Sequence, residues 1–499
     1  MPEPFRQPAG LARGGVAPLS AFDLLVRGGT VVTPAGCASC DVGVADGLVV
    51  AVGPDLEGSA RETVDAEGLH VFPGVVDVHV HCNDPGRADS EGFAHGTSAL
   101  AAGGTTTFVD MPLNASPPTV DGPSFDLKVA AATGAAFVDF ALWGGLVPGD
   151  VDRLDELADR GVVGFKAFMC DTGMDDFPAA DDDTLQTGMA RAARLGLPVA
   201  VHAESAELTT RLAAEAVREG RTSMRDYLAS RPVVAELEAI ARAIAIAGET
   251  GCSLHVVHVS TGSGVRLIET AREAGVDVTC ETCPHYLALD EEDALRLGMV
   301  AKCSPPLRSR ADVENLWGTL LEGLVDLVDS DHSPSRPELK LGDDAFVAWG
   351  GIAGCQTLLR VLLTVGPRCG LSFESIATLC AETPARRFGL AGKGSLEPGA
   401  DADLVLVDSA HDSVVRTEEL LSLHRLSPFV GRQLRGKIER TILRGSTICL
   451  GGVMVASPGG RFARPASRTN HGGEVGGAKG RPEGRPRKEK RVTHTSTQQ

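Results

Sequence analysis

The sequence lacks any run of about 18 apolar residues, the length that a helix needs to span a membrane. It is also short of positive charge, because the formal net charge of its 499 residues is −19. Such an acidic chain is poorly suited to nucleic acid or an anionic membrane surface as its main partner. The N-terminus lacks the compact apolar core of a secretory signal. These absences predict a protein with neither a membrane nor a nucleic-acid partner.

The 12 cysteines are scattered, mostly singly within apolar runs, as in a cytoplasmic protein with reduced, buried thiols. Two C-x-x-C spacings occur, at Cys37/Cys40 and at Cys280/Cys283, and together they could ligate a structural zinc ion. One pair lies in a turn-like segment and the other in a predicted strand, so chance is the better explanation. We therefore predict a cytoplasmic location and no site built from these thiols.

Two segments far apart in the chain predict one small β-sandwich. Residues 22–72 contain short alternating apolar runs separated by Gly-Gly and Asp-Gly turns, and similar runs return over residues 391–456. This pattern is typical of antiparallel strands. Residues 1–21 are rich in Pro, Gly and Ala, and residues 457–499 are basic and poor in apolar residues, so both are predicted to be disordered. The basic tail could bind nucleic acid, but a solvated tail is the preferred interpretation.

Between residues 73 and 390, strand-like and helix-like segments alternate. Eight such units in succession predict a closed (β/α)8 barrel of the TIM type, inserted into the β-sandwich. An open doubly wound sheet would more naturally use five or six strands and a glycine-rich phosphate loop after the first, and no such loop follows it. The predicted strands are Val75–His81, Thr105–Met111, Ala136–Trp143, Val162–Phe168, Pro198–His202, Ser253–Val259, Val276–Thr282 and Leu324–Asp331.

The first predicted barrel strand carries His79 and His81. Because side chains alternate along a strand, both imidazoles face the same side. Two imidazoles in this arrangement can ligate one metal ion. A pair of hydrogen-bonded core histidines would give the same pattern, so this motif alone does not decide between the two.

Four further polar residues stand at or near the ends of other predicted strands, where barrels of this type place their catalytic groups. Buried ionisable groups cost several kcal/mol each unless they are paired or bound to metal, so their convergence indicates a metal centre. His255 is three residues from the sixth strand's terminal histidine and is predicted to face the helical layer instead. The four residues are Lys166, His202, His258 and Asp331.

The predicted ligands are nitrogen and oxygen atoms without thiolates, which suits Zn²⁺, with Co²⁺, Mn²⁺ or Fe²⁺ as alternatives. They are too many for one tetrahedral ion but enough for two ions about 3.5–4 Å apart. An ammonium group would repel both ions. Burial lowers the pKa of a lysine, and the neutral amine of Lys166 can then add carbon dioxide to become an anionic carbamate that bridges the two ions.

The strings HVH, GFKAF, VHAE, HVVHVS and SDHSP together resemble the amidohydrolase superfamily, in its cyclic-amidase branch, and within that branch they are most similar to the allantoinases. The similarity covers residues 22–455 and includes HCNDPGR, DMPLN, ETCPHYL, KCSPPLR, AWGG and HRLSPFVGR. Allantoinases usually have HFNEPGR, so Cys82 and Asp84 depart from the pattern. Neither position is a predicted ligand.

The resemblance implies roles for each member of the site. His79 and His81 bind the more buried ion, His202 and His258 bind the other, and carboxylated Lys166 bridges the pair. Asp331 binds the buried ion and serves as general base and acid. The resemblance also implies a homotetramer that acts on a small molecule, with substrate contacts from Asn83, Asn114, Ser304 and Gly350.

Three positions separate the branches of the family. Dihydroorotases have an arginine where this chain has Asn83, and dihydropyrimidinases and hydantoinases have a tyrosine where it has Asp171. Those enzymes also have Pro-Asn-Gly in place of Trp349-Gly350-Gly351. We therefore predict hydrolysis of the hydantoin ring amide of allantoin to give allantoate. The alternatives are a hydantoinase or dihydropyrimidinase, or a metal-free scaffold, which would be expected to lack several of the six metal residues.

Overall fold

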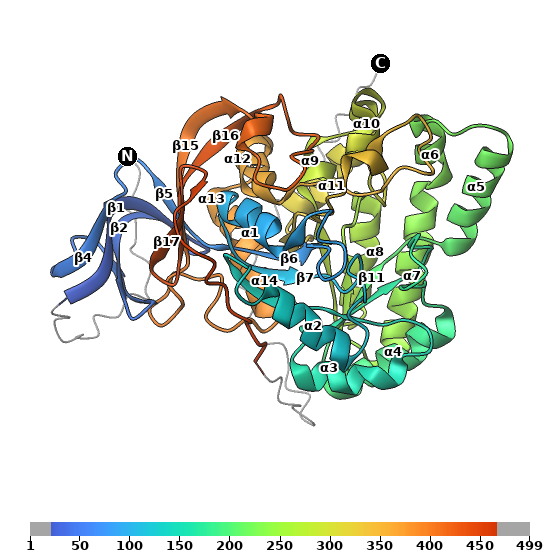
Figure 1. Ribbon diagram of the computed structural model, residues 1–499, viewed down its shortest axis with the longest axis horizontal. Coiled ribbons are helices and arrows are strands. Elements are labelled where there is room, and N and C mark those ends of the chain that lie inside the picture. Colours follow the sequence, from blue (N-terminus) through green and yellow to red (C-terminus); the bar gives the residue numbers. More distant parts are fainter. Residues whose placement is uncertain (1–20, 467–499) are drawn as a thin grey trace, which may run out of the picture.

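The computed structural model describes residues 21–466, in which strands from the two ends of the chain form one nine-stranded sheet. Its order is β18-β17-β16-β15-β5-β1-β2-β3, with β4 beside β1. The antiparallel pairing of β5 with β15 joins the two halves, which lie together at one end of the molecule (Figure 1). The strands are β1 (Ala21–Thr33), β2 (Gly36–Ala45), β3 (Leu48–Gly53), β4 (Ser59–Asp65), β5 (His70–Pro73), β15 (Leu404–Val414), β16 (Gln433–Leu443), β17 (Ser446–Leu450) and β18 (Val453–Met454).

Parallel strands between these two halves form the barrel. Its third strand is broken at Trp143 into β8 and β9, and each of the eight predicted strands overlaps an observed one. The sixth strand ends at Val256 and the eighth has only two residues, so both are shorter than predicted. The barrel strands are β6 (Val75–Val80), β7 (Thr105–Asp110), β8 (Asp139–Leu142), β9 (Gly144–Gly145), β10 (Phe165–Phe168), β11 (Val199–His202), β12 (Leu254–Val256), β13 (Val278–Thr282) and β14 (Leu327–Val328).

Backbone hydrogen bonds close the ring between the two groups of strands, β6 to β8 and β9 to β14. Val163 N donates to Leu142 O at 2.9 Å, and His81 N donates to His332 O at 2.8 Å. The barrel strands are almost entirely buried, as expected when helices cover the outside and side chains fill the inside. The predicted fold class, a (β/α)8 barrel with β-rich terminal segments, is confirmed. The exact domain limits stay predictions.

Helices follow the strands and cover the barrel (Figure 1). Several begin at a side chain that accepts a backbone N–H, such as Asp121 before α2 and Thr261 before α8, which stabilises the first turn. Among residues 21–466, no helix is long and apolar enough to cross a membrane. The helices are α1 (Gly92–Ala102), α2 (Gly122–Ala132), α3 (Leu154–Arg160), α4 (Asp182–Leu195), α5 (Ala206–Arg218), α6 (Met224–Ser230), α7 (Val233–Thr250), α8 (Gly262–Glu273), α9 (Pro284–Ala288), α10 (Glu291–Leu297), α11 (Arg310–Leu321), α12 (Leu358–Cys369), α13 (Phe373–Ala377) and α14 (Thr383–Arg387).

The segment after the last strand corrects the prediction of a disordered tail from residue 457. Phe140 N donates to Arg461 O at 2.9 Å, and Ala463 N donates to Phe140 O at 2.7 Å. The ring of Phe462 packs against Phe125 and Phe140, with centroids 5.7 and 5.8 Å away. Residues 457–466 therefore pair with barrel strand β8, and we call them the C-terminal strap. The predictions for residues 1–20 and 467–499 lie outside the described residues.

Candidate metal centre

The six predicted metal residues are all buried, each at most 7% exposed, and their side chains converge. Asp331 Oδ1 lies 3.3 Å from His79 Nε2 and 3.7 Å from His81 Nε2. The ring centroid of His258 lies 5.4 Å from that of His79 and 4.6 Å from that of His202. The structure thus brings histidines from β6 and β11, and from the segment after β12, to one point.

Lys166 lies in β10 and is completely buried. Its Nζ has no hydrogen-bond partner among residues 21–466 and stands 5.0 Å from the centroid of the Phe168 ring. Burial is the main cause that lowers the pKa of Lys166 to about 8, although Glu281 and Asp331 oppose the shift. A lysine without a partner in the protein interior is a strong sign of a functional role.

Glu281, in β13, orients the first histidine and was not predicted as a site residue. One carboxylate oxygen contacts His79 Nδ1 and accepts from His258 N at 3.1 Å. The other contacts His255 Nε2 at 2.9 Å. Carboxylates commonly hold metal-ligating histidines in this way, since the bond fixes the ring and its tautomer. The signal in the sequence was a glutamate near the end of a predicted barrel strand, where barrels of this type place their catalytic groups.

Glu204 plays the same part for His202 and was also missed. Its Oε2 lies 2.8 Å from His202 Nε2, so that the Nδ1 side of the ring is left for a ligand. The same oxygen pairs with Arg231. Burial opposes ionisation, but the charge of Arg231 and the bond to His202 lower the pKa of Glu204 to about 2. The signal in the sequence was an acidic residue two positions after a strand-terminal histidine.

Buried nitrogen atoms without a partner in the described chain fit a site for divalent metal ions. Lys166 Nζ, His81 Nδ1 and His258 Nδ1 are buried without a hydrogen-bond partner in the described chain. The ligand atoms of His79, His81 and Asp331 lie within 4.8 Å of one another. Burial lowers the pKa of His81, His202 and His258, which favours the neutral imidazoles that metal binding requires.

The backbone is strained where the site is built. Asn83, Asn114, His258 and Asp331 have φ of 60°, 68°, 39° and 43°, a region that non-glycine residues rarely adopt. Such conformations cost about 1–3 kcal/mol and gather at functional sites. They also correct one step of the sequence argument. Strand parity predicted that His255 and His258 face opposite sides, but the two residues do not lie in one continuous strand. β12 ends at Val256, and His258 reaches the centre through its left-handed backbone.

The sequence predicted that His255 faces the helical layer, and this prediction is only partly correct. The ring of His255 packs against Phe388, with centroids 5.2 Å apart, while its Nε2 reaches inward to Glu281 and its Nδ1 lies 2.9 Å from Thr279 Oγ1. His255 is therefore a buried support of the carboxylate that orients His79.

The four predicted substrate residues fall into two places. Asn83 and Asn114 line one cavity of about 370 Å³, together with Trp349. Ser304 and Gly350 lie near each other, because a Cβ added at Gly350 would stand 3.6 Å from Ser304 Oγ. Trp349 and Gly350 are consecutive, so one short segment connects the two places.

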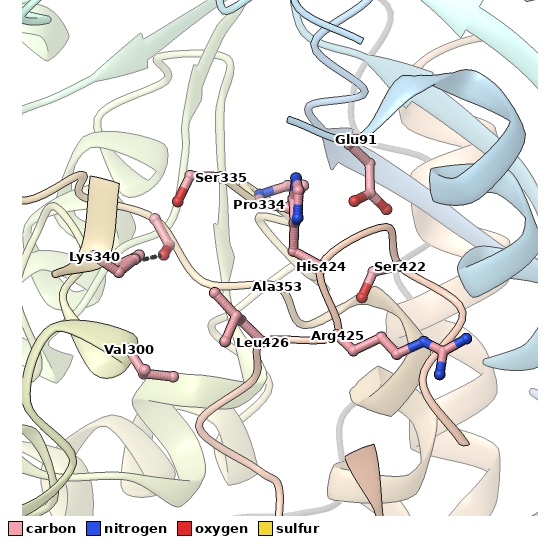
Figure 2. Close-up of a pocket in the computed structure, with 11 residues that line it drawn as sticks. Glu91, Val300, Pro334, Ser335, Lys340, Ala353, Ser422, His424, Arg425 and Leu426 are labelled. Carbon is pink, nitrogen blue, oxygen red and sulfur yellow. Dashed lines mark hydrogen bonds between the residues drawn. The ribbon is translucent and has the colours of Figure 1, made fainter. Parts of the chain in front are cut away.

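A second, narrower cavity is lined by Glu91, Ser335 and His424 among others (Figure 2), and Ser335 lines both cavities. Glu91 Oε1 lies 3.3 Å from His332 Nε2, and Glu91 Oε2 accepts from Leu423 N at 3.1 Å. Because His332 directly follows Asp331, this glutamate connects the HRLSPFVGR region to the loop that carries Asp331.

The sequence profile of the amidohydrolase family matches residues 70–448, and the chain belongs to that family. The prediction of a hydrolytic enzyme is confirmed, and the family is metal-dependent. Among curated proteins, the chain is 63% identical to the allantoinase of Rubrobacter xylanophilus, over 90% of this chain and 98% of that one. It is 53% identical to the allantoinase of Solibacter usitatus, with the same two coverages.

Solved structures of two relatives share the fold. The L-hydantoinase (dihydropyrimidinase) from Arthrobacter aurescens has a TM-score of 0.87 and is 37% identical, over 89% of this chain and all of that one. The dihydropyrimidinase from Brevibacillus agri NCHU1002 has a TM-score of 0.83 and is 32% identical, over 89% of this chain and 98% of that one. Both support the barrel and the β-rich terminal segments.

Proposed function

We propose that this chain is an allantoinase, which hydrolyses the hydantoin ring amide of allantoin to give allantoate. The observation that carries the proposal is the 63% identity to an allantoinase over 90% of the chain. A hydantoinase or dihydropyrimidinase is the second candidate, because solved structures of that kind share the fold. The metal-free scaffold is disfavoured, since all six metal residues are present and converge.

Two positions favour the first candidate. Asn83 occupies the place of the dihydroorotase arginine and carries no charge to hold a substrate carboxylate. Asp171 occupies the place of the hydantoinase tyrosine, but it is exposed and its Oδ1 accepts from Gly173 N at 2.9 Å. Asp171 thus stabilises a turn and offers no hydroxyl to the reacting carbonyl.

We infer two divalent ions, best suited to Zn²⁺, with Co²⁺, Mn²⁺ and Fe²⁺ as alternatives. His79, His81, Lys166, His202, His258 and Asp331 would hold them. When bound, such ions polarise the amide carbonyl and make water a better nucleophile at neutral pH. The neutral Lys166 amine attacks the carbon of carbon dioxide, forms an N–C bond and loses a proton. The resulting carbamate would supply negative charge to offset that of the ions, which the neutral imidazoles cannot.

Asp331 performs the proton transfers. Burial alone would raise the pKa of Asp331, but the neighbouring imidazoles hold this pKa well below its usual range. The carboxylate is therefore ionised and can accept a proton from the attacking water. It then gives that proton to the ring nitrogen as the amide bond breaks. Glu281 keeps His79 in place beside it, and the backbone near Ser304 and Gly350 orients the ring. The homotetramer and the cytoplasmic location stay predictions.

Turnover of four cyclic amides by the purified protein tests the assignment. We expect kcat/KM for allantoin to exceed that for dihydrouracil or dihydroorotate by at least about a hundredfold, with unsubstituted hydantoin between. Dihydroorotate would bury its carboxylate against no matching cation. Equal or faster turnover of dihydrouracil would contradict the allantoinase assignment and leave the metal centre unaffected.

A further inference from the structure

Three carbonyl oxygens surround the amino group of Lys340, the last residue of a 3-10 helix (Pro337–Lys340). Its Nζ donates to Met299 O at 2.9 Å, to Lys302 O at 3.3 Å and to Gly351 O at 2.6 Å. The bond to Gly351 is the dashed line beside Lys340 in Figure 2. Only the protonated amine has three N–H donors for three acceptors. The ammonium group therefore holds together two backbone segments that are distant in sequence.

These two segments carry the predicted ring contacts, Ser304 and Gly350. They are also joined to each other directly, because Gly351 N donates to Lys302 O at 2.9 Å. The side chain of Lys302, which is 6% exposed, adds a second connection, since its Nζ donates to Ala348 O. Both lysine side chains and a backbone hydrogen bond thus fix the two ring contacts relative to each other.

Tyr227, in α6, holds the Ser304 segment through its hydroxyl group. The hydroxyl donates to Cys303 O at 3.0 Å and lies 2.5 Å from Ser304 Oγ. Because a phenol has one proton, the Ser304 hydroxyl is the donor in the second bond. Tyr227 is 4% exposed, and its ring centroid lies 4.5 Å from Lys302 Nζ, within the range of a cation–π contact. Tyr227 therefore fixes both the backbone and the side chain of this segment.

The Gly350 segment in turn lies against the loop that carries Asp331. Ser333 N donates to Ile352 O at 2.9 Å. A Cβ added at Gly351 would stand 2.5 Å from Ser333 O, so the close approach of the two backbones requires glycine. A shift of this segment would therefore displace the ring contacts relative to the predicted proton carrier.

We propose that Lys340 and Tyr227 are positioning residues for the substrate, which hold the backbone around Ser304 and Gly350 beside the loop that carries Asp331. Both residues act through that backbone and not on the reacting atoms. Contacts that bind a substrate and its transition state equally well affect KM and leave kcat unchanged, so a loss of positioning should appear mainly in KM. This assignment rests on the proposed function, from which it takes the ring contacts, and deepens it.

The test measures kcat and KM for allantoin in two variants. Lys340→Met keeps an unbranched side chain and removes all three hydrogen bonds. We expect KM to rise about tenfold or more, because a displacement of about 1 Å in a site can cost about 10²-fold. Metal content should be unchanged, and kcat should stay within about threefold of the original value. Tyr227→Phe removes only a hydroxyl and should raise KM about fivefold, which tests the proposal even if Lys340→Met does not fold.

Lys393→Met is the matched control, because Lys393 is also buried but contacts three carboxylates of the protein. It should lower the melting temperature and leave KM unchanged. A variant of Lys340 or Tyr227 that retains the original KM would overturn the positioning role of that residue, whatever its melting temperature. If the unmodified enzyme does not hydrolyse allantoin, the proposed function fails instead, and the same comparison of KM is made on the cyclic amide that it does hydrolyse.

Discussion

Two buried lysines of this protein have opposite surroundings. Lys393 Nζ lies 2.6, 2.7 and 2.9 Å from carboxylate oxygens of Asp139, Asp401 and Asp403. Burial alone would lower its pKa, but these carboxylates raise the pKa above the usual value of a lysine. Lys166 is more deeply buried than Lys393, yet its Nζ has no hydrogen-bond partner in the described part of the chain, and burial lowers its pKa.

The difference distinguishes Lys393, whose charge stabilises the fold, from Lys166, which is available for a chemical reaction. Lys393 connects barrel strand β8, through Asp139, to the segment that leads into β15, and therefore connects the barrel to the terminal sheet. Breaking such a buried cluster leaves charges uncompensated and destabilises the fold. Lys166 Nζ has no hydrogen-bond partner within the described protein, which is expected when the side chain is completed by a group from outside the polypeptide.

The largest effect is expected at Lys166. In Lys166→Ala, metal content and turnover should be lost together, with kcat lower by about 10³-fold or more, since metal ions supply several kcal/mol to such reactions. Metal analysis and steady-state kinetics provide the measurement. Added short carboxylic acids should restore part of the turnover by replacing the carbamate. A variant that retains both its metal and its full activity would refute the bridging role.

A smaller loss of turnover is expected for Asp331→Asn, which keeps the shape and one oxygen but cannot accept a proton. General acid–base catalysis is worth about 10²–10⁴-fold, so kcat should fall within that range while the melting temperature changes little. The comparison must be made on protein loaded with metal. Near-normal turnover in such a sample would exclude Asp331 as the proton carrier.

Lys393→Met should have the opposite effect, a loss of stability without a loss of turnover. The free energy of unfolding should drop by about 3–5 kcal/mol, while metal content and kcat of the folded protein are retained. Because the pKa of Lys393 is raised on folding, its contribution is complete below the unfolded value of 10.5 and is lost as pH rises above it. Urea unfolding of both proteins should therefore show a constant difference around neutral pH and a shrinking one in strong alkali. A pH-independent difference would argue against the ion cluster as the cause.

The smallest effect concerns the C-terminal strap. Ending the chain after Ala456 removes the backbone pairing with Phe140 and the partly buried ring of Phe462, which should cost about 1–3 kcal/mol of stability. Ending it after Ala466 is the matched control and should leave the melting temperature and turnover unchanged. Two truncations with identical melting temperatures would show that the strap does not stabilise the barrel.

The sequence predicted those parts of the protein that are encoded by side-chain pattern. Apolar runs located all eight barrel strands, and strand parity placed His79 and His81 on one face. The strap was missed because it binds through backbone hydrogen bonds, and its Gly- and Pro-containing sequence has no periodicity. Glu281 was missed as a site residue because its role depends on histidines from other strands, and pairings between distant strands are invisible in one sequence. Glu204 is only two positions from His202, but the turn that brings its carboxylate back to the imidazole has no pattern in the sequence. The three hydrogen bonds of Lys340 likewise exist only once the fold is complete.

The pairing of β5 with β15 has a consequence for how the protein is made. The side chains of His70 and Ser409 hydrogen bond at 3.0 Å although 339 positions separate them in sequence. At a synthesis rate of about 5–20 residues per second, the first strands wait roughly 20–70 s on the ribosome for their partners. During that interval β5 presents an unpaired edge, which invites pairing with other chains. A newly made chain therefore has most need of a chaperone at its first strands, whose pairing is among the last to be completed.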